Sequence, residues 1–72
     1  MKKTFKIDVD CANCAAKMER AIEAIPGVSS ISIGFLTQKF KIEAEDERFD
    51  EIMAEAQKLC RKIERHSKIY ME

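Results

Sequence analysis

The sequence predicts an α+β domain in which two helices pack on one face of a four-stranded antiparallel sheet. Three observations carry this prediction. Apolar residues alternate with polar ones in several short segments and recur at helical spacing in two longer ones. These segments follow the order strand, helix, strand, strand, helix, strand. The chain has 72 residues, which is enough for one small core, so residues 1–72 are expected to form a single domain.

The first half of the chain holds a strand and a helix that ends abruptly. The strand is predicted over Thr4–Val9 and leads into the segment Asp10–Cys14. One apolar helical face, with spacings of four, four and three residues, is then formed by Cys14, Met18, Ile22 and Ile25. Asn13 is the expected N-cap, since its side chain can accept a hydrogen bond from the first turn. Pro26-Gly27 ends the helix.

The second half predicts a hairpin, a helix and a last short strand. Ser30–Phe35 and Lys39–Ala44 alternate and are joined by a turn at Leu36–Gln38. The polar run Glu45–Arg48 opens the second helix, where its acidic groups favour the positive end of the helix dipole. The apolar face of that helix comprises Phe49, Ile52, Met53, Ala56, Leu59, Cys60 and Ile63. Ser67–Met71 is long enough for the last strand.

This element order fits the ferredoxin-like βαββαβ sandwich with short connections. In that topology the first strand lies antiparallel beside the last. The connection after the second helix therefore arrives close to the cysteine-containing segment Asp10–Cys14.

Composition excludes several functional classes. Thirteen basic and thirteen acidic residues cancel, so the positive field of a nucleic-acid-binding protein is absent. RNA binding on this fold would require exposed aromatic residues, whereas Phe5, Phe35 and Phe40 are interpreted as core. No apolar run approaches the ~20 residues of a membrane span, and no signal peptide is visible. We expect a cytoplasmic, monomeric domain with no direct membrane insertion.

Three cysteines are too few for a disulfide scaffold, and two of them, Cys11 and Cys14, form a CxxC pair. A CxxC pair in a reducing compartment indicates either a soft metal ion or a dithiol–disulfide couple. Cys14 falls near the start of a helix, where unpaired N–H groups are expected to lower its pKa. Asp10, directly before Cys11, adds a carboxylate that disfavours thiolates until a dication is bound.

The segment Asp10–Glu19, followed by Ile25–Val28, resembles the heavy-metal-associated domain, and the resemblance extends over essentially the whole chain. The copper-handling branch of that family usually carries Gly-Met-Thr/Ser before the first cysteine, where this chain has Asp8-Val9-Asp10. An aspartate in this position is instead similar to the domains of zinc-, cadmium- and lead-exporting ATPases. The resemblance implies that Cys11, Cys14 and Asp10 bind a divalent ion (zinc, cadmium or lead) rather than copper(I).

Cys60 has two interpretations. It lies on the apolar stripe of the second helix, where free cysteine packs as a small hydrophobe, and toward the end of that helix that approaches Asp10–Cys14. It is therefore either a core residue or an additional metal ligand.

The function implied is a non-catalytic domain that binds and transfers a heavy-metal ion. The resemblance places it in the cytosolic N-terminal part of a metal-exporting P-type ATPase, docking to other domains of the pump or to a metal donor. A free-standing metallochaperone, including one for copper(I), is the alternative within the family. A thiol oxidoreductase using Cys11 and Cys14 is the alternative from the enzyme class.

Overall fold

The computed structural model describes residues 1–71. The elements follow the predicted order, with a short 3-10 helix (η1) before the second α-helix. They are β1 (Lys2–Asp8), α1 (Ala12–Glu23), β2 (Val28–Gly34), β3 (Lys39–Ala44), η1 (Asp46–Arg48), α2 (Phe49–Ile63) and β4 (Lys68–Tyr70). The last strand is thus shorter than the predicted Ser67–Met71. Ser67 does not extend it because its N–H donates to the carbonyl of Glu64 (3.1 Å).

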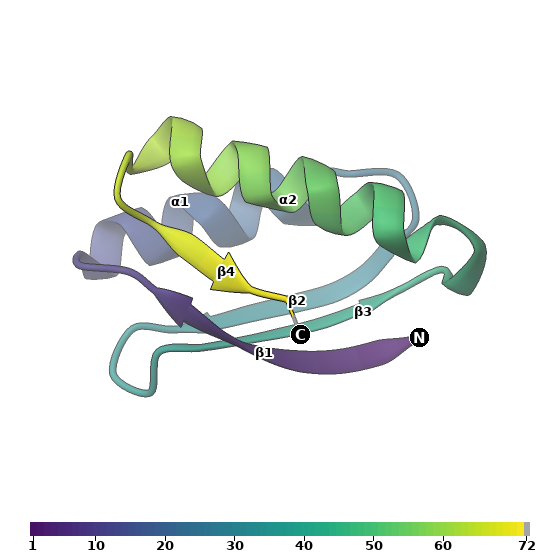
Figure 1. Cartoon of the computed structure of the whole chain (residues 1–72), viewed down its shortest axis with the longest axis horizontal. Helices are drawn as coiled ribbons and strands as arrows, with labels where there is room; N and C mark the ends of the chain where they lie inside the picture. Colours follow the sequence, from purple (N-terminus) through teal and green to yellow (C-terminus); the bar gives the residue numbers. More distant parts are fainter. Residues whose placement is uncertain (72) are drawn as a thin grey trace.

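The four strands form one antiparallel sheet in the order β2-β3-β1-β4. β1 lies between β3 and β4, and Ile7 of β1 faces Ile69 of β4 in the register. Both α-helices cover the same face of the sheet (Figure 1). This arrangement is the ferredoxin-like sandwich that the element order predicted, and it brings the end of β1, the start of α1 and the end of α2 to one end of the molecule.

The core lies between the helices and the inward face of the sheet. Its fully buried members with the largest side chains are Phe40, Ile7, Met18, Ile22, Ile42, Ile52 and Ile69. The central positions of the predicted helical faces are confirmed: Met18 and Ile22 of α1 are buried, as are most of the apolar residues predicted for α2. Cys14 is only partly buried, and Ile25, predicted as the last residue of the first face, lies beyond the end of α1. Phe35 is an exception, since it is 36% exposed. β2 ends at Gly34, so Phe35 falls in the turn and outside the strand alternation.

The stop after α1 has the predicted cause. Pro26 cannot continue a helix, and Gly27 adopts a φ of +99°, which a residue with a Cβ disfavours. A Cβ on Gly27 would also lie 3.0 Å from Cδ1 of Ile52 on α2. Gly27 therefore allows a tight turn that lies close to the second helix and lets β2 begin at Val28. Neither helix within residues 1–71 is long and apolar enough to cross a membrane.

Candidate metal centre

The segment Asp10–Cys14, which we call the metal loop, joins the end of β1 to the first turn of α1. Cys11 is the N-cap of α1: its backbone is extended, and its sulfur accepts a hydrogen bond from the N–H of Cys14 (3.3 Å). The expectation that Asn13 caps the helix is therefore wrong, because the thiol of Cys11 takes that place. Both cysteines are partly exposed and carry free thiols, so they are accessible from solvent.

The two thiols have opposite pKa shifts. Backbone N–H donation from Cys14, helped by the Cys14 side chain and by the N–H of Asn13, lowers the pKa of Cys11. The pKa of Cys14 is instead raised to about 11, chiefly because its thiol hydrogen-bonds to Cys11 and is partly desolvated. The expectation that the helix start lowers the pKa of Cys14 is wrong, since the N-terminal N–H groups act on the capping sulfur. Of the two thiols, Cys11 is therefore the one whose ionisation the start of α1 favours.

Glu64 is a neighbour of the thiols that the sequence analysis did not identify. It follows the last residue of α2, and its Oε1 accepts a hydrogen bond from the N–H of Asp10 (3.3 Å). Its charge raises the pKa of both Cys11 and Cys14, and its side chain also hydrogen-bonds to the Cys14 thiol. The predicted approach of the second helix to the metal loop was the signal that pointed to this region. Glu64 lies one helical turn after Cys60, so its carboxylate is the group that this approach brings near the metal loop.

The structure places the other two predicted ligands differently. Asp10 is exposed in the metal loop. Cys60 is fully buried among core residues, and burial raises the pKa of its thiol to about 11. Within residues 1–71, no three or more His, Cys, Asp or Glu side chains converge in a group that could hold a metal ion. The structure therefore brings the two thiols together at the start of α1, and it does not gather Asp10 or Cys60 into a larger cluster with them.

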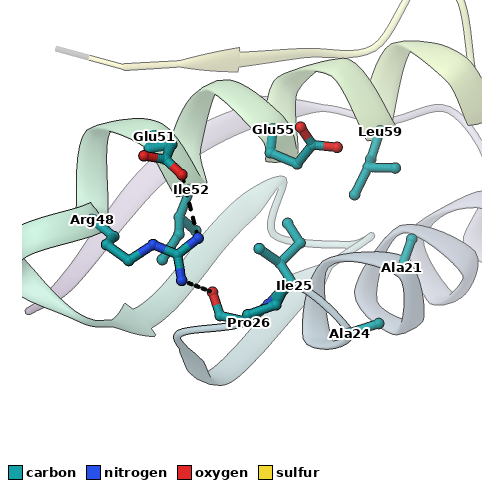
Figure 2. A pocket seen from close by; sticks show the side chains of 9 residues that line it. All are labelled: Ala21, Ala24, Ile25, Pro26, Arg48, Glu51, Ile52, Glu55 and Leu59. Carbon is teal, nitrogen blue, oxygen red and sulfur yellow. Dashed lines mark hydrogen bonds and ion pairs between the residues drawn. The ribbon is translucent and has the colours of Figure 1, made fainter.

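Cys11 and Cys14 do not line the hollow between the two helices. A hollow of about 390 Å³ lies between the far end of α1 and α2 (Figure 2). Ile25, Ile52 and Leu59 supply apolar lining, and Arg48 closes one side by donating to the carbonyl of Pro26 (3.3 Å). Its described lining residues include no cysteine. The thiols instead lie, partly exposed, between the end of β1 and the first turn of α1.

Comparison with known proteins agrees with this arrangement. Residues 4–68 match the sequence profile of the heavy-metal-associated domain. A zinc/cadmium/lead-transporting P-type ATPase of Shigella sonnei (strain Ss046) is 32% identical over 50 residues, which are 69% of this chain and 7% of that protein's length. The match thus spans a small fraction of the ATPase.

Solved structures share the fold. The N-terminal domain of the copper(I) ATPase PacS in its apo form superposes with a TM-score of 0.77 at 20% identity, covering 100% of this chain and 93% of that one. The CopZ metallochaperone superposes with a TM-score of 0.76 at 13% identity, covering 97% of this chain and 100% of that one. With the profile match over most of its length, the chain belongs to the heavy-metal-associated domain family.

Proposed function

We propose that this domain binds one divalent heavy-metal ion (zinc, cadmium or lead) through Cys11 and Cys14 and passes it to a partner. The observation that carries the proposal is the pair of partly exposed thiols at the start of α1, one of them already favoured as thiolate. Thiolates are strong ligands for these ions, and an exposed two-sulfur site leaves positions for a partner's ligands. Such a site can exchange its ion, which a closed four-ligand site resists.

The carboxylates near the thiols support a divalent ion over copper(I). Asp10 precedes the first thiol, and Glu64 lies beside both. Zinc accepts oxygen together with sulfur in about four-coordinate geometry, whereas copper(I) is satisfied by two sulfurs. A carboxylate that opposes thiolates in the empty site becomes attractive once a dication is present. We propose Asp10 as the third ligand, with Glu64 close enough to compete for that role.

The similarity to the ATPase suggests the kind of larger protein to which this domain belongs. We propose that the domain is the cytosolic N-terminal part of a metal-exporting P-type ATPase and docks to other domains of the pump or to a metal donor. The likeness to PacS and to CopZ is one of fold, and a free-standing metallochaperone, including one for copper(I), remains the alternative. A coding sequence that continues into membrane helices and a phosphorylation domain would favour the ATPase.

The test is an anaerobic titration of reduced protein with zinc, in competition with a chromophoric chelator. Wild-type protein should bind one zinc ion, and the Cys11→Ala/Cys14→Ala double variant should lose tight binding because no second pair of accessible thiols exists in residues 1–71. Cys60→Ala serves as the matched control that removes a thiol elsewhere. Submicromolar zinc affinity in the double variant would contradict the assignment.

The same titration decides between the two carboxylates. Asp10→Asn should weaken zinc binding by more than about tenfold, equivalent to ~1.4 kcal/mol, and copper(I) binding much less. Glu64→Gln is the matched variant, since it also removes one charge at constant size. A larger loss of zinc affinity in Glu64→Gln would assign the third ligand to the end of α2 instead of the metal loop.

The split between the thiol pKa values also suits a dithiol oxidoreductase, in which one thiolate attacks a disulfide. Insulin reduction at neutral pH distinguishes the two functions. We expect no turnover above that of free dithiothreitol. Catalytic insulin reduction that depends on Cys11, without submicromolar zinc affinity, would favour the oxidoreductase.

A further inference from the structure

Gln38 makes an unusual set of contacts for a turn residue. It is the last residue of the turn between β2 and β3, with a φ of +55°. Its Oε1 accepts a hydrogen bond from the N–H of Val9 (2.9 Å), and its Nε2 donates to the carbonyl of the same residue (2.8 Å). Nε2 also donates to the carbonyl of Phe35 (2.6 Å) within the turn. One side-chain amide therefore ties the turn to the residue directly before the metal loop.

The geometry of the sheet explains why this tie is needed. The register between β1 and β3 ends with Lys6 opposite Lys39, after which only the N–H of Ile7 reaches the carbonyl of Gln38 (3.1 Å). Beyond that point β3 has turned away, so the backbone of Val9 has no strand partner on this side. The amide of Gln38 supplies one donor and one acceptor, as a strand residue would, and extends the ladder by side-chain contacts.

Two other side chains hold the neighbouring residues. Ser67, which is almost fully buried, donates its hydroxyl to the carbonyl of Asp8 (2.8 Å). Glu64 accepts from the N–H of Asp10 (3.3 Å). Three consecutive residues at the entrance to the metal loop are therefore held by side chains from two separate parts of the chain, the β2–β3 turn and the connection between α2 and β4. Of these three side chains, Glu64 also lies beside the thiols, whereas Gln38 acts from the far side of β1.

The backbone conformation of Gln38 also indicates that its side-chain contacts matter. A positive φ is unfavourable for a residue with a long side chain and is adopted more easily by glycine or asparagine. Neither of these could replace the contacts, because glycine has no side chain and asparagine is one methylene shorter. A glutamine in this conformation is therefore explained by what its amide holds.

We propose that Gln38 is a positioning residue for the metal loop. By fixing both polar groups of Val9 it sets the direction in which the chain enters Asp10 and Cys11, and so the placement of the capping sulfur relative to Cys14. The proposal rests on the proposed function, since it concerns the ion bound by those thiols. Groups that orient metal ligands from outside the coordination sphere commonly change affinity by about 10–100-fold when removed.

The test uses Gln38→Gly and Gln38→Asn, both of which tolerate the positive φ, so that any loss reports the missing contacts and not backbone strain. Both variants should bind zinc about tenfold more weakly than wild type. Amide hydrogen exchange of the metal-free protein, followed by NMR, should accelerate at Val9, Asp10 and Cys11. The cadmium–thiolate absorbance at saturation should be unchanged, because both sulfurs still bind.

The chain offers a matched control in Gln57 of α2. Its amide makes the same pair of hydrogen bonds, to the N–H (2.9 Å) and carbonyl (3.0 Å) of Ile69 on β4, but does not touch the metal loop entrance. Gln57→Ala should accelerate exchange at Ile69 and leave zinc affinity within about twofold of wild type.

Three outcomes would overturn the proposal. Wild-type zinc affinity in both Gln38 variants would do so while leaving the proposed function intact. Unchanged exchange at Val9 would show that the contact does not hold the loop in solution, and an equal loss of affinity in Gln57→Ala would show general destabilisation. A wild-type protein without zinc affinity would instead contradict the proposed function, and this inference with it.

Discussion

At the scale of single residues, the two thiols differ because only one of them caps a helix. The sulfur of Cys11 accepts hydrogen bonds from N–H groups at the start of α1, whereas the pKa of Cys14 is raised because its thiol is a hydrogen-bond donor to that sulfur, is partly desolvated and lies near the charge of Glu64. A capping sulfur is stabilised as thiolate for the same reason that carboxylates are favoured at helix N-termini. Ionisation is therefore easier at Cys11 than at Cys14.

This asymmetry predicts the order of chemical modification. Iodoacetamide reacts with thiolates, so at pH 8 it should modify Cys11 first, Cys14 much more slowly and buried Cys60 last. As pH rises, the alkylation rate at Cys11 should reach half of its maximum below the ordinary thiol pKa of 9.0, and that at Cys14 only near pH 11. Mass spectrometry of quenched peptides measures both profiles. Equal rates at Cys11 and Cys14 throughout would contradict the capping assignment.

Cys11 and Cys14 could be singled out from the sequence because a CxxC pair between a strand and a helix is a local pattern. The sequence does not show which thiol is ionised, since that depends on the residue that occupies the N-cap. Asn13 is the better capping residue by type, but Cys11 has the extended backbone that the N-cap requires. The contact of Gln38 was beyond prediction because it joins residues 29 positions apart. For Glu64, whose contact joins residues 54 positions apart, the topology indicated the region but not the residue.

At the scale of elements, the last turns of α2 contribute first to the core and then to the candidate site. Cys60 lies fully buried on its apolar face, and Glu64, one turn later, reaches Asp10. The helix thus ends beside the metal loop, and the first residue after it contacts that loop. Its position fixes Glu64 beside the thiols, and the packing of Cys60 helps to hold that position.

Cys60→Ala should lower the free energy of unfolding by about 1 kcal/mol, because it removes one buried sulfur from a packed core. Urea denaturation measures this loss. Zinc and cadmium affinities should stay within about twofold of wild type, and the cadmium–thiolate absorbance should keep its two-sulfur intensity. A three-sulfur cadmium spectrum that collapses in Cys60→Ala would make Cys60 a ligand for that ion.

At the scale of the whole molecule, the core is built without the metal loop. Its buried residues come from all four strands and both helices, while Cys14, the last residue of the metal loop, is only partly buried and packs against it from the margin. The ferredoxin-like arrangement was predictable because each strand and helix carries its own periodicity and the connections are short. The exposure of Phe35 and the shortened β4 were not, because both depend on where pairing stops.

The metal-free protein should therefore already be folded. Its far-ultraviolet circular dichroism should match that of the zinc-loaded protein, unlike a zinc finger, which is unfolded without metal. Zinc at about 100 times its dissociation constant should still add ~2.7 kcal/mol to the free energy of unfolding, since it binds the folded state. A random-coil spectrum without metal would mean that the ion is structural.

The two ends of the described chain lie away from the thiols. Met1 and Met71 border one hollow beside Phe49 and η1, near the start of β1, whereas the metal loop follows the end of that strand (Figure 1). A tether, linker or surface attached near either of these residues would therefore hold the domain at the end opposite the metal loop. Its thiols would then lie at the opposite end of the domain, where a second protein could reach them without a change in the fold.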